Sequence, residues 1–323
     1  MPVLRQSSFP GSPRYQLNGH LQTIFPSVLR TVEGVVYERE RLTLSDGDFV
    51  DLDWIDRNSE KIVIMTHGLE GDSNRHYIKG TAKLFARHGW DVLAWNCRSC
   101  SGEMNRAFRL YNHGEIGDLG EVIAHVLRTK PYRELVLIGY SMGGNIALKY
   151  AGVHGKNAPD ALRNVVAVSS PTDLQASAKR LDLPGNRFYR NRFMKKLIVK
   201  LQQKADLFPG KLDMTQLRSV RLWRDFDDHF SAPVNGYRDA DDFYTQASAV
   251  NYMDGIAVPA LLINAQNDPL LSPECSPAWL AEKHPNIYLE TPRTGGHVGF
   301  AVRGDEFTWA ERRALEFVGP FGR

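Results

Sequence analysis

Few features of this chain point to a secreted, membrane-embedded or nucleic-acid-binding protein. Its 323 residues include only three cysteines, too few for a disulfide framework, so we expect a reducing compartment and a cytoplasmic location. No apolar run approaches the length of a membrane span, and a net charge of +3 is too small to indicate a nucleic-acid partner. Residues 1–17 hold three prolines and no apolar run, so we expect no signal peptide. What remains is a composition typical of a globular protein.

Apolar runs with strand character alternate with helical patterns along most of the chain. This alternation predicts the α/β class, with a mostly parallel twisted sheet and helices on both of its faces. In such sheets the functional residues gather at the carboxyl ends of the strands. The predicted strands are residues 31–44, 49–55, 61–66, 91–95, 134–138, 164–169, 260–264 and 286–290, and the clearest helices are 81–88 and 118–129.

One long segment, residues 172–255, breaks this alternation. It is polar and helical in pattern, and it is much longer than a usual connection between two strands. It follows the sixth of the predicted major strands. We therefore expect a helical cap at 172–255, inserted into a core made of residues 1–171 and 256–323.

The most informative motif is the run Gly139-Tyr140-Ser141-Met142-Gly143, between a predicted strand and a predicted helix. A G-x-S-x-G in this position is typical of a nucleophile elbow, where a serine occupies a sharp and strained turn. Residues two positions to either side must lack side chains, which explains the two glycines. The N–H of Met142, at the start of the helix, would face negative charge that develops on a substrate.

A nucleophilic serine also needs a base, an orienting carboxylate and a second oxyanion donor. His297 follows the last predicted strand in a glycine-rich loop, and Asp268 follows the strand before it. Leu69, in a small-residue turn after the strand at 61–66, would supply the second N–H. The chain order Ser141, Asp268, His297 is the order found in α/β-hydrolases. These positions predict a serine enzyme that forms an acyl-enzyme with a carboxylic ester.

At these residues the sequence resembles the α/β-hydrolase superfamily and, within it, the YheT-like branch, the type 4 family of carboxylesterases. The resemblance implies an intracellular serine ester hydrolase that uses no cofactor or metal, and it supports Ser141, Asp268 and His297 as the triad. One departure is Ser99, where the family tends to have glycine. The likeness extends over nearly the whole chain, through residues 18–24, 67–71, 96–103, Tyr111, Gly114, 118–119, 139–143, 226–227, 242–248 and the segments around Asp268 and His297.

The expected substrate is a small-molecule ester, with a short to medium acyl chain or a lipid-like one. Two other functions are compatible with the same residues. One is acyl transfer, in which an acceptor other than water takes the acyl group from Ser141. The other is a non-catalytic binding protein on a hydrolase scaffold, which an intact triad disfavours.

Several other residues have a possible chemical role, and for each we favour a more ordinary one. Cys97 and Cys100 have the spacing of half a zinc or redox site but lack further ligands nearby. His113 and Asp118 have the H-x-x-x-x-D spacing of some glycerolipid acyltransferases, but we expect Asp118 to be a carboxylate at a helix N-terminus. Asp173 could replace the expected triad acid, but we expect it to cap the first cap helix.

Residues 187–204 within the expected cap contain seven basic residues and no acidic one. Their apolar residues recur at helical spacing, which predicts an amphipathic helix. We favour a helix that packs its apolar stripe on the protein's own core and solvates its charges. The alternative is a lid whose basic rim contacts an anionic lipid or a membrane surface. The apolar stripe is Phe193, Met194, Leu197, Ile198 and Leu201, and the basic residues are Arg187, Arg190, Arg192, Lys195, Lys196, Lys200 and Lys204.

Overall fold

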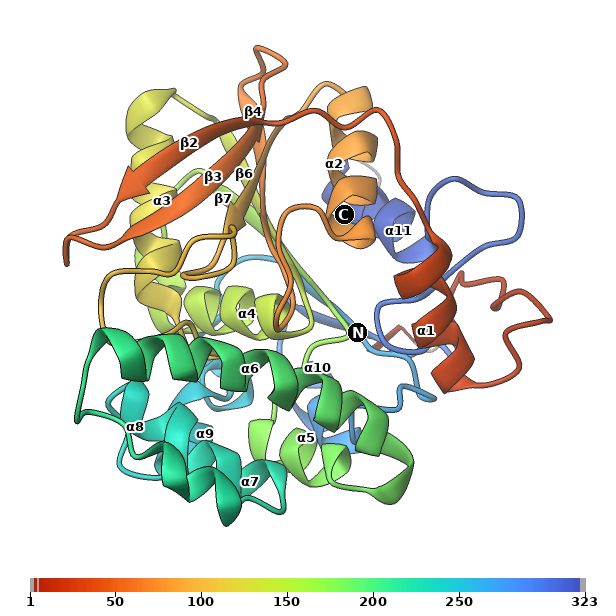
Figure 1. Ribbon diagram of the computed structural model, residues 1–323. Coiled ribbons are helices and arrows are strands. Elements are labelled where there is room, and N and C mark those ends of the chain that lie inside the picture. The colour runs from red at the N-terminus through yellow and green to blue at the C-terminus, as the bar shows by residue number, and fades with distance from the viewer. Residues whose placement is uncertain (1–2, 5, 320–323) are drawn as a thin grey trace.

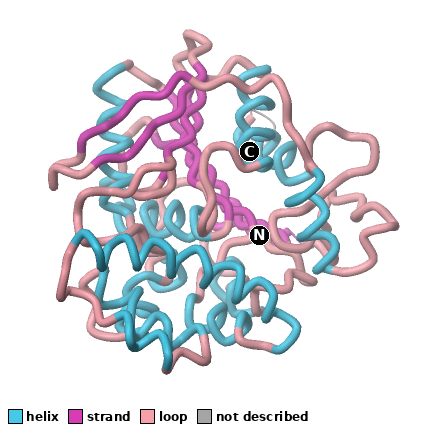
Figure 2. Tube along the Cα trace, viewed as in Figure 1, coloured by secondary structure: helices cyan, strands magenta, loops and turns pink. Residues whose placement is uncertain are grey.

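A computed structural model describes residues 3–4 and 6–319, and its strands form a single sheet between helices (Figures 1 and 2). The strands are β1 (Val3–Leu4), β2 (Glu38–Thr43), β3 (Phe49–Ile55), β4 (Lys61–Thr66), β5 (Asp91–Asn96), β6 (Glu134–Tyr140), β7 (Leu162–Val168), β8 (Ala260–Ile263) and β9 (Ile287–Glu290). Their order in the sheet is β1-β9-β8-β7-β6-β4-β5-β3-β2. β3 pairs antiparallel with β2 and β5, whereas the other neighbours are parallel. The mostly parallel sheet is thereby confirmed.

The register of the central strands aligns their carboxyl ends along one edge of the sheet. Thr66 of β4 is opposite Gly139 of β6, and Val168 of β7 is opposite both Tyr140 of β6 and Ile263 of β8. The loops that follow these strands therefore start side by side. This alignment brings together segments that are more than 100 residues apart in the chain.

Helices cover both faces of the sheet because successive residues of each strand point to opposite sides. On β4, Ile62 and Ile64 share one apolar cluster with α3 and α4, whereas Val63 and Met65 share another with α2 and α11. The two helix pairs lie on opposite sides of the strands in Figure 1. The helices outside the 172–255 segment are α1 (Gly19–Leu29), α2 (His76–Arg87), α3 (Ile116–Thr129), α4 (Met142–His154), α10 (Ala278–Ala281) and α11 (Trp309–Val318).

The structure differs most from the predicted elements at three places. β1 was not expected, because two residues at a sheet edge leave no pattern in the sequence. Residues 31–37 are not part of β2, and Val35 and Tyr37 instead pack from a loop against the cluster beneath α2. α2 begins at His76 rather than at residue 81, since its N-cap Arg75 makes no side-chain capping bond that would mark the start.

Between β7 and β8 the described chain is helical, as expected for residues 172–255. Its helices are α5 (Leu174–Leu181), α6 (Arg187–Leu207), α7 (Trp223–Phe226), α8 (Ala232–Val234) and α9 (Ala240–Ala247), with a π-helical turn at Asp227–Ser231. They gather beyond α4, at one end of the sheet (Figure 1). Leu174, Trp223 and Phe243 form an apolar cluster among these helices. The division of the chain into core and cap domains stays a prediction.

No helix in the described ranges combines the length and the apolar character that crossing a bilayer requires.

Candidate active site

Ser141 lies on the predicted sharp turn, between the end of β6 and the first residue of α4. Its φ of 54° and ψ of −120° put a non-glycine residue in a region that L-amino acids rarely adopt. A Cβ on Gly139 would lie 2.1 Å from the carbonyl oxygen of Gly143, and one on Gly143 would lie 2.2 Å from that of Thr66. Both glycines of the motif are therefore required by close packing of the backbone.

The structure brings Ser141, His297 and Asp268 together in one chain of hydrogen bonds. His297 Nε2 is 2.9 Å from Ser141 Oγ, and His297 Nδ1 is 2.8 Å from Asp268 Oδ2. The Asp268 side chain is 0% exposed and that of His297 is 11% exposed. The other carboxylate oxygen of Asp268 accepts from the N–H of Leu270. When His297 Nδ1 carries a proton and donates it in a hydrogen bond to the Asp268 carboxylate, Nε2 is unprotonated and can take the Ser141 proton.

Asp173, the rival acid, does not join this chain of hydrogen bonds. It is the N-cap of α5, and its side chain accepts from the N–H of Ala176 at 2.9 Å. The prediction that Asp173 caps the first helix of the 172–255 segment is confirmed.

The loop after β4 lies against Ser141 and is held in place on all sides. A Cβ on Gly68 would be 3.1 Å from Ser141 Cβ. The ring of His67 lies between the Gly68 carbonyl oxygen at Nδ1 and the Cys97 N–H at Nε2. Burial lowers the pKa of His67 to about 4, so the ring is neutral and fixed in one tautomer. Tyr77 Oη accepts from the Gly68 N–H at 3.2 Å.

Leu69 and Met142, the two expected oxyanion donors, lie in the segments next to Ser141. Leu69 follows Gly68, and Met142 is the first residue of α4. Within the described residues, neither backbone N–H donates to a protein acceptor. The N–H groups on either side of Leu69 do have acceptors, since Gly68 donates to Tyr77 and Glu70 donates to Tyr111. The loop therefore leaves the Leu69 donor unpaired next to Ser141.

The loop that carries His297 is held by helix α1, which sequence reasoning did not connect with the site. Gln22 Oε1 accepts from the Gly295 N–H, and Thr23 Oγ1 accepts from the His297 N–H, each at 2.8 Å. These two bonds fix the backbone on both sides of the glycine pair. The only indication in the sequence was the family resemblance at residues 18–24.

Helix α1 also contacts the turn that carries Asp268. Gln22 Oε1 accepts from Asn267 Nδ2 at 2.8 Å, and a Cβ on Gly19 would lie 1.9 Å from the Asn267 carbonyl oxygen. One helix therefore contacts the loops of both the expected base and the expected acid through two of its side chains. Its close approach to Asn267 leaves no room for a larger residue at position 19.

Two cavities meet at Ser141, and five residues line both: Leu69, Ser141, Phe193, Leu270 and His297. The first, which we call the apolar cavity, measures about 110 Å³ and extends under α6. The second, the basic cavity, measures about 280 Å³ and is bounded by α1, the start of α2 and α6. The apolar cavity is lined mainly by Leu174, Leu181, Leu197, Leu201, Trp223, Phe226, Phe230 and Phe243, and the basic cavity includes Arg30, Glu70, Arg75, His76, Arg192 and Lys196.

The family model for the alpha/beta hydrolase fold matches residues 61–303, three quarters of the chain. The chain belongs to the α/β-hydrolase family. YheT of Escherichia coli (strain K12), whose name as an esterase is provisional, is 34% identical over 88% of this chain and 84% of its own. The predicted place in the YheT-like branch is thereby confirmed. The protein named Phospholipase ABHD3 from Mus musculus is 28% identical over 98% of this chain and 79% of its own.

A solved structure, the Pyrococcus furiosus esterase Pf2001, superposes on this α/β-hydrolase with a TM-score of 0.60 and 21% identity. The match covers 89% of this chain and 95% of the esterase. At this identity the likeness establishes the fold alone.

Two segments of the family resemblance, 226–227 and 242–248, meet at the wall of the apolar cavity. Tyr244 Oη donates to Asp227 Oδ2 at 2.7 Å, and both residues line the cavity. Burial raises the pKa of Asp227 to about 7, despite this hydrogen bond. Asp227 also begins the π-helical turn, an irregularity that is frequent at functional sites.

The apolar stripe of α6 faces the apolar cavity, where Phe193, Leu197 and Leu201 form part of the wall. The remaining members, Met194 and Ile198, pack in the cluster around Phe226 and Phe230. The stripe thus packs within the protein, as predicted, but mainly against other residues of the 172–255 segment rather than against the predicted core.

Three lysines of α6 lie one turn apart and reach loops of the core. Lys196 donates to the Glu70 carbonyl oxygen at 3.3 Å, and Lys200 pairs with Glu70 Oε1 at 2.9 Å. Lys204 is buried and donates to the carbonyl oxygens of residues 105 and 107, and burial lowers its pKa to about 8. The prediction that the charges of this helix are solvated is therefore wrong for Lys200 and Lys204, because spacings of four residues put both on the core side.

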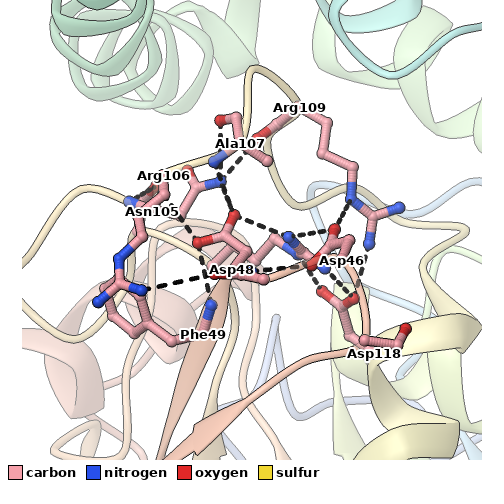
Figure 3. Close-up of polar contacts among 12 residues, drawn as sticks. Asp46, Asp48, Phe49, Asn105, Arg106, Ala107, Arg109 and Asp118 are labelled. Carbon is pink, nitrogen blue, oxygen red and sulfur yellow. Dashed lines mark hydrogen bonds and ion pairs between the residues drawn. The ribbon is translucent and has the colours of Figure 1, made fainter.

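Beneath these lysines, a network of buried charges fixes the loop between β5 and α3 (Figure 3). Arg98 binds Asp118 through two bonds of 2.7 and 2.8 Å and Asp48 through one of 2.7 Å. Arg109 adds a bond of 2.7 Å to Asp118. Asp118 lies in the first turn of α3, as predicted, and both of its carboxylate oxygens accept hydrogen bonds from arginines. His113, by contrast, lines the apolar cavity. This arrangement favours a structural role for Asp118.

The loop also explains the one departure from the family pattern. Ser99 has a φ of 61°, in the left-handed region where glycine is favoured. Its hydroxyl donates to Asn105 Oδ1 at 2.5 Å, which offsets part of that cost. The neighbouring Cys97 and Cys100 are free and buried, and burial raises the pKa of both thiols.

Proposed function

We propose that this protein is a serine carboxylic-ester hydrolase that works through an acyl-enzyme. The observation that carries the proposal is the hydrogen-bond chain from Asp268 through His297 to Ser141, at the point where two cavities meet. A base held in one tautomer beside a strained serine is the arrangement that activates a hydroxyl as a nucleophile.

In the first half-reaction Ser141 Oγ attacks the ester carbonyl carbon while His297 Nε2 takes the hydroxyl proton. The oxyanion of the tetrahedral intermediate accepts hydrogen bonds from the N–H groups of Leu69 and Met142, and each bond lowers the activation barrier by a few kcal/mol. The ester C–O bond then breaks, and His297 gives its proton to the departing alcohol. Asp268 holds the imidazole in place and stabilises its charged form.

In the second half-reaction water attacks the acyl-enzyme while His297 takes one of its protons. The bond between the acyl carbon and Ser141 Oγ breaks, Ser141 recovers the proton, and the acid leaves. An alcohol in place of water would complete acyl transfer instead. The apolar cavity suits a short to medium or lipid-like acyl chain, because its walls are mainly leucine and phenylalanine.

The proposal is tested with p-nitrophenyl esters of graded acyl length. We expect turnover by the wild type and none above background for Ser141→Ala, since that change removes only Oγ. Ser219→Ala, at an exposed serine far along the chain, is the matched control and should behave as the wild type. Hydrolysis by the Ser141→Ala variant at near wild-type rate would contradict the proposal, and added alcohols would reveal acyl transfer through new ester products.

We keep the cytoplasm as the proposed location, because all three cysteines are free and buried thiols.

A further inference from the structure

The basic cavity contains more positive than negative charge. Three cations line it without a carboxylate within ion-pair distance among the described residues: Arg75, Arg192 and Lys196. A fourth, Arg30, is paired with the buried Glu311 at 2.6 Å. The acidic residue in the lining, Glu70, has its carboxylate engaged elsewhere, by Lys200 at 2.9 Å and Tyr111 Oη at 2.5 Å.

Two of these cations converge on one neutral atom. Arg75 Nη2 and Lys196 Nζ both donate to the Glu70 carbonyl oxygen, so a guanidinium from the core and an ammonium from α6 lie close together. Like charges this close repel unless an anion lies between or beside them. Arg192 precedes Lys196 by one turn of α6 and therefore adds its charge on the same side of the helix.

Burial, together with these cations, shifts the pKa of neighbouring groups. Burial and then Arg75 lower the pKa of Lys196. Burial, Arg30 and Arg75 lower the pKa of His76 to about 3, so its ring is neutral. Its Nδ1 is buried and has no hydrogen-bond partner among the described residues, although the side chain lines the cavity. The cavity therefore offers cations and an unused polar nitrogen, and it opens at the reacting serine.

We propose that the basic cavity binds the alcohol part of the ester, and that this alcohol carries an anionic oxygen group, a phosphate or a carboxylate. The anion would bridge Arg75 of the core and Arg192 and Lys196 of α6, while the acyl chain enters the apolar cavity. This inference rests on the proposed function, because it assigns the two sides of the scissile bond to the two cavities that meet at Ser141.

The test compares three octanoyl esters that differ only in the alcohol: glycerol, glycerate and glycerol 3-phosphate. For the wild type at low salt, kcat/KM should be at least about tenfold higher for an anionic ester than for the neutral one, the effect of one charge-assisted contact. Salt should reduce this ratio. The ratio for glycerate against glycerol 3-phosphate distinguishes a carboxylate from a phosphate ligand.

Substitutions of single cations test whether the preference for anionic esters arises in the basic cavity. Arg192→Gln and Lys196→Gln should each lower the ratio of anionic to neutral kcat/KM by about tenfold. Lys195→Gln removes an equal charge from the exposed side of the same helix and should leave the ratio unchanged. Equal rates for the three esters at low salt, or equal ratios in Lys196→Gln and Lys195→Gln, would overturn the inference.

Failure of the proposed function would be recognised separately, as no turnover of any ester. In that case, calorimetric titration of the wild type with glycerol 3-phosphate decides the inference. Binding that is weakened by Lys196→Gln and not by Lys195→Gln supports an anion site, and absence of binding refutes it.

Discussion

The two cavities that meet at Ser141 share five lining residues but differ in how their polar groups are satisfied. In the apolar cavity the buried carboxyl of Asp227 has a partner in Tyr244. In the basic cavity Arg75, Arg192 and Lys196 have no carboxylate partner among the described residues. An unpaired charge is tolerable only where solvent or a ligand reaches it. The polar group of the apolar cavity is therefore satisfied by the protein itself, whereas the three cations of the basic cavity are left to solvent or to a ligand.

Helix α6 contributes to both cavities, with different faces. Leu197 and Leu201 face the apolar cavity, and Arg192 and Lys196 face the basic one. The preference for the acyl group and the preference for the alcohol should thus be separable by substitutions a few residues apart on one helix. Single substitutions can therefore remove the triad that the two cavities share or alter one cavity alone.

The largest effect is expected for Asp268→Asn, because both cavities depend on the same base. The amide favours the wrong tautomer of His297, so kcat should fall by about three to four orders of magnitude for every ester, neutral or anionic. Asp173→Asn is the matched control. It should keep its activity and nearly all of its stability, because the amide oxygen of Asn can still accept the capping bond from Ala176. Interchanged phenotypes in steady-state kinetics would show that the acid is Asp173.

A smaller and selective effect is expected for Leu197→Trp, which fills part of the apolar cavity. The kcat/KM for an octanoyl ester should fall by about 10–100-fold relative to an acetyl ester, since the longer chain loses buried volume and contacts. Val199→Trp places the same ring on the outer face of α6, at a residue that is 54% exposed. Identical chain-length profiles for the two variants would show that acyl chains do not enter this cavity.

The smallest effect concerns the titration of Asp227. Its pKa is raised from 3.8 to about 7 by burial, so the folded protein binds a proton that the unfolded chain has lost between these values. The free energy of unfolding should therefore fall as pH rises through this range and level off above it. Asp227→Asn removes this titration. From pH 5 to pH 8 the free energy of unfolding of the wild type, measured by urea denaturation, should therefore fall by about 2 kcal/mol more than that of the variant.

Asp206→Asn, at an exposed position of α6, is the control and should follow the wild type. A wild-type advantage over Asp227→Asn that is the same at both pH values would mean that the carboxyl does not titrate in this range.

The sequence predicted the parts of the fold and site that depend on local pattern. Six central strands from β3 to β8 lie within three residues of their predicted positions, because each is a short apolar run between turn residues. The elbow was predictable because only glycine fits on both sides of Ser141. His297 and Asp268 could be placed because residues after parallel strands share one edge of the sheet. Their catalytic role stays a prediction.

The remaining features depend on contacts between distant segments, which no local pattern encodes. Gln22 and Thr23 bind the His297 loop, although more than 270 residues separate them from it in the sequence. Nothing in the local sequence distinguishes the buried Lys204 from the exposed Lys195, because the acceptors of Lys204 lie in a loop about 100 residues away. The pairing of Asp227 with Tyr244 likewise depends on the packing of the π-helical turn against α9.

The central claim is that Ser141 is the nucleophile, activated by His297. It is tested most directly by treating the folded protein with a fluorophosphonate probe and mapping the adduct by mass spectrometry. We predict one adduct per chain, on the peptide that contains Ser141, with labelling abolished by Ser141→Ala and strongly slowed by His297→Ala. An unlabelled wild type, or an adduct that persists in Ser141→Ala, would contradict the claim.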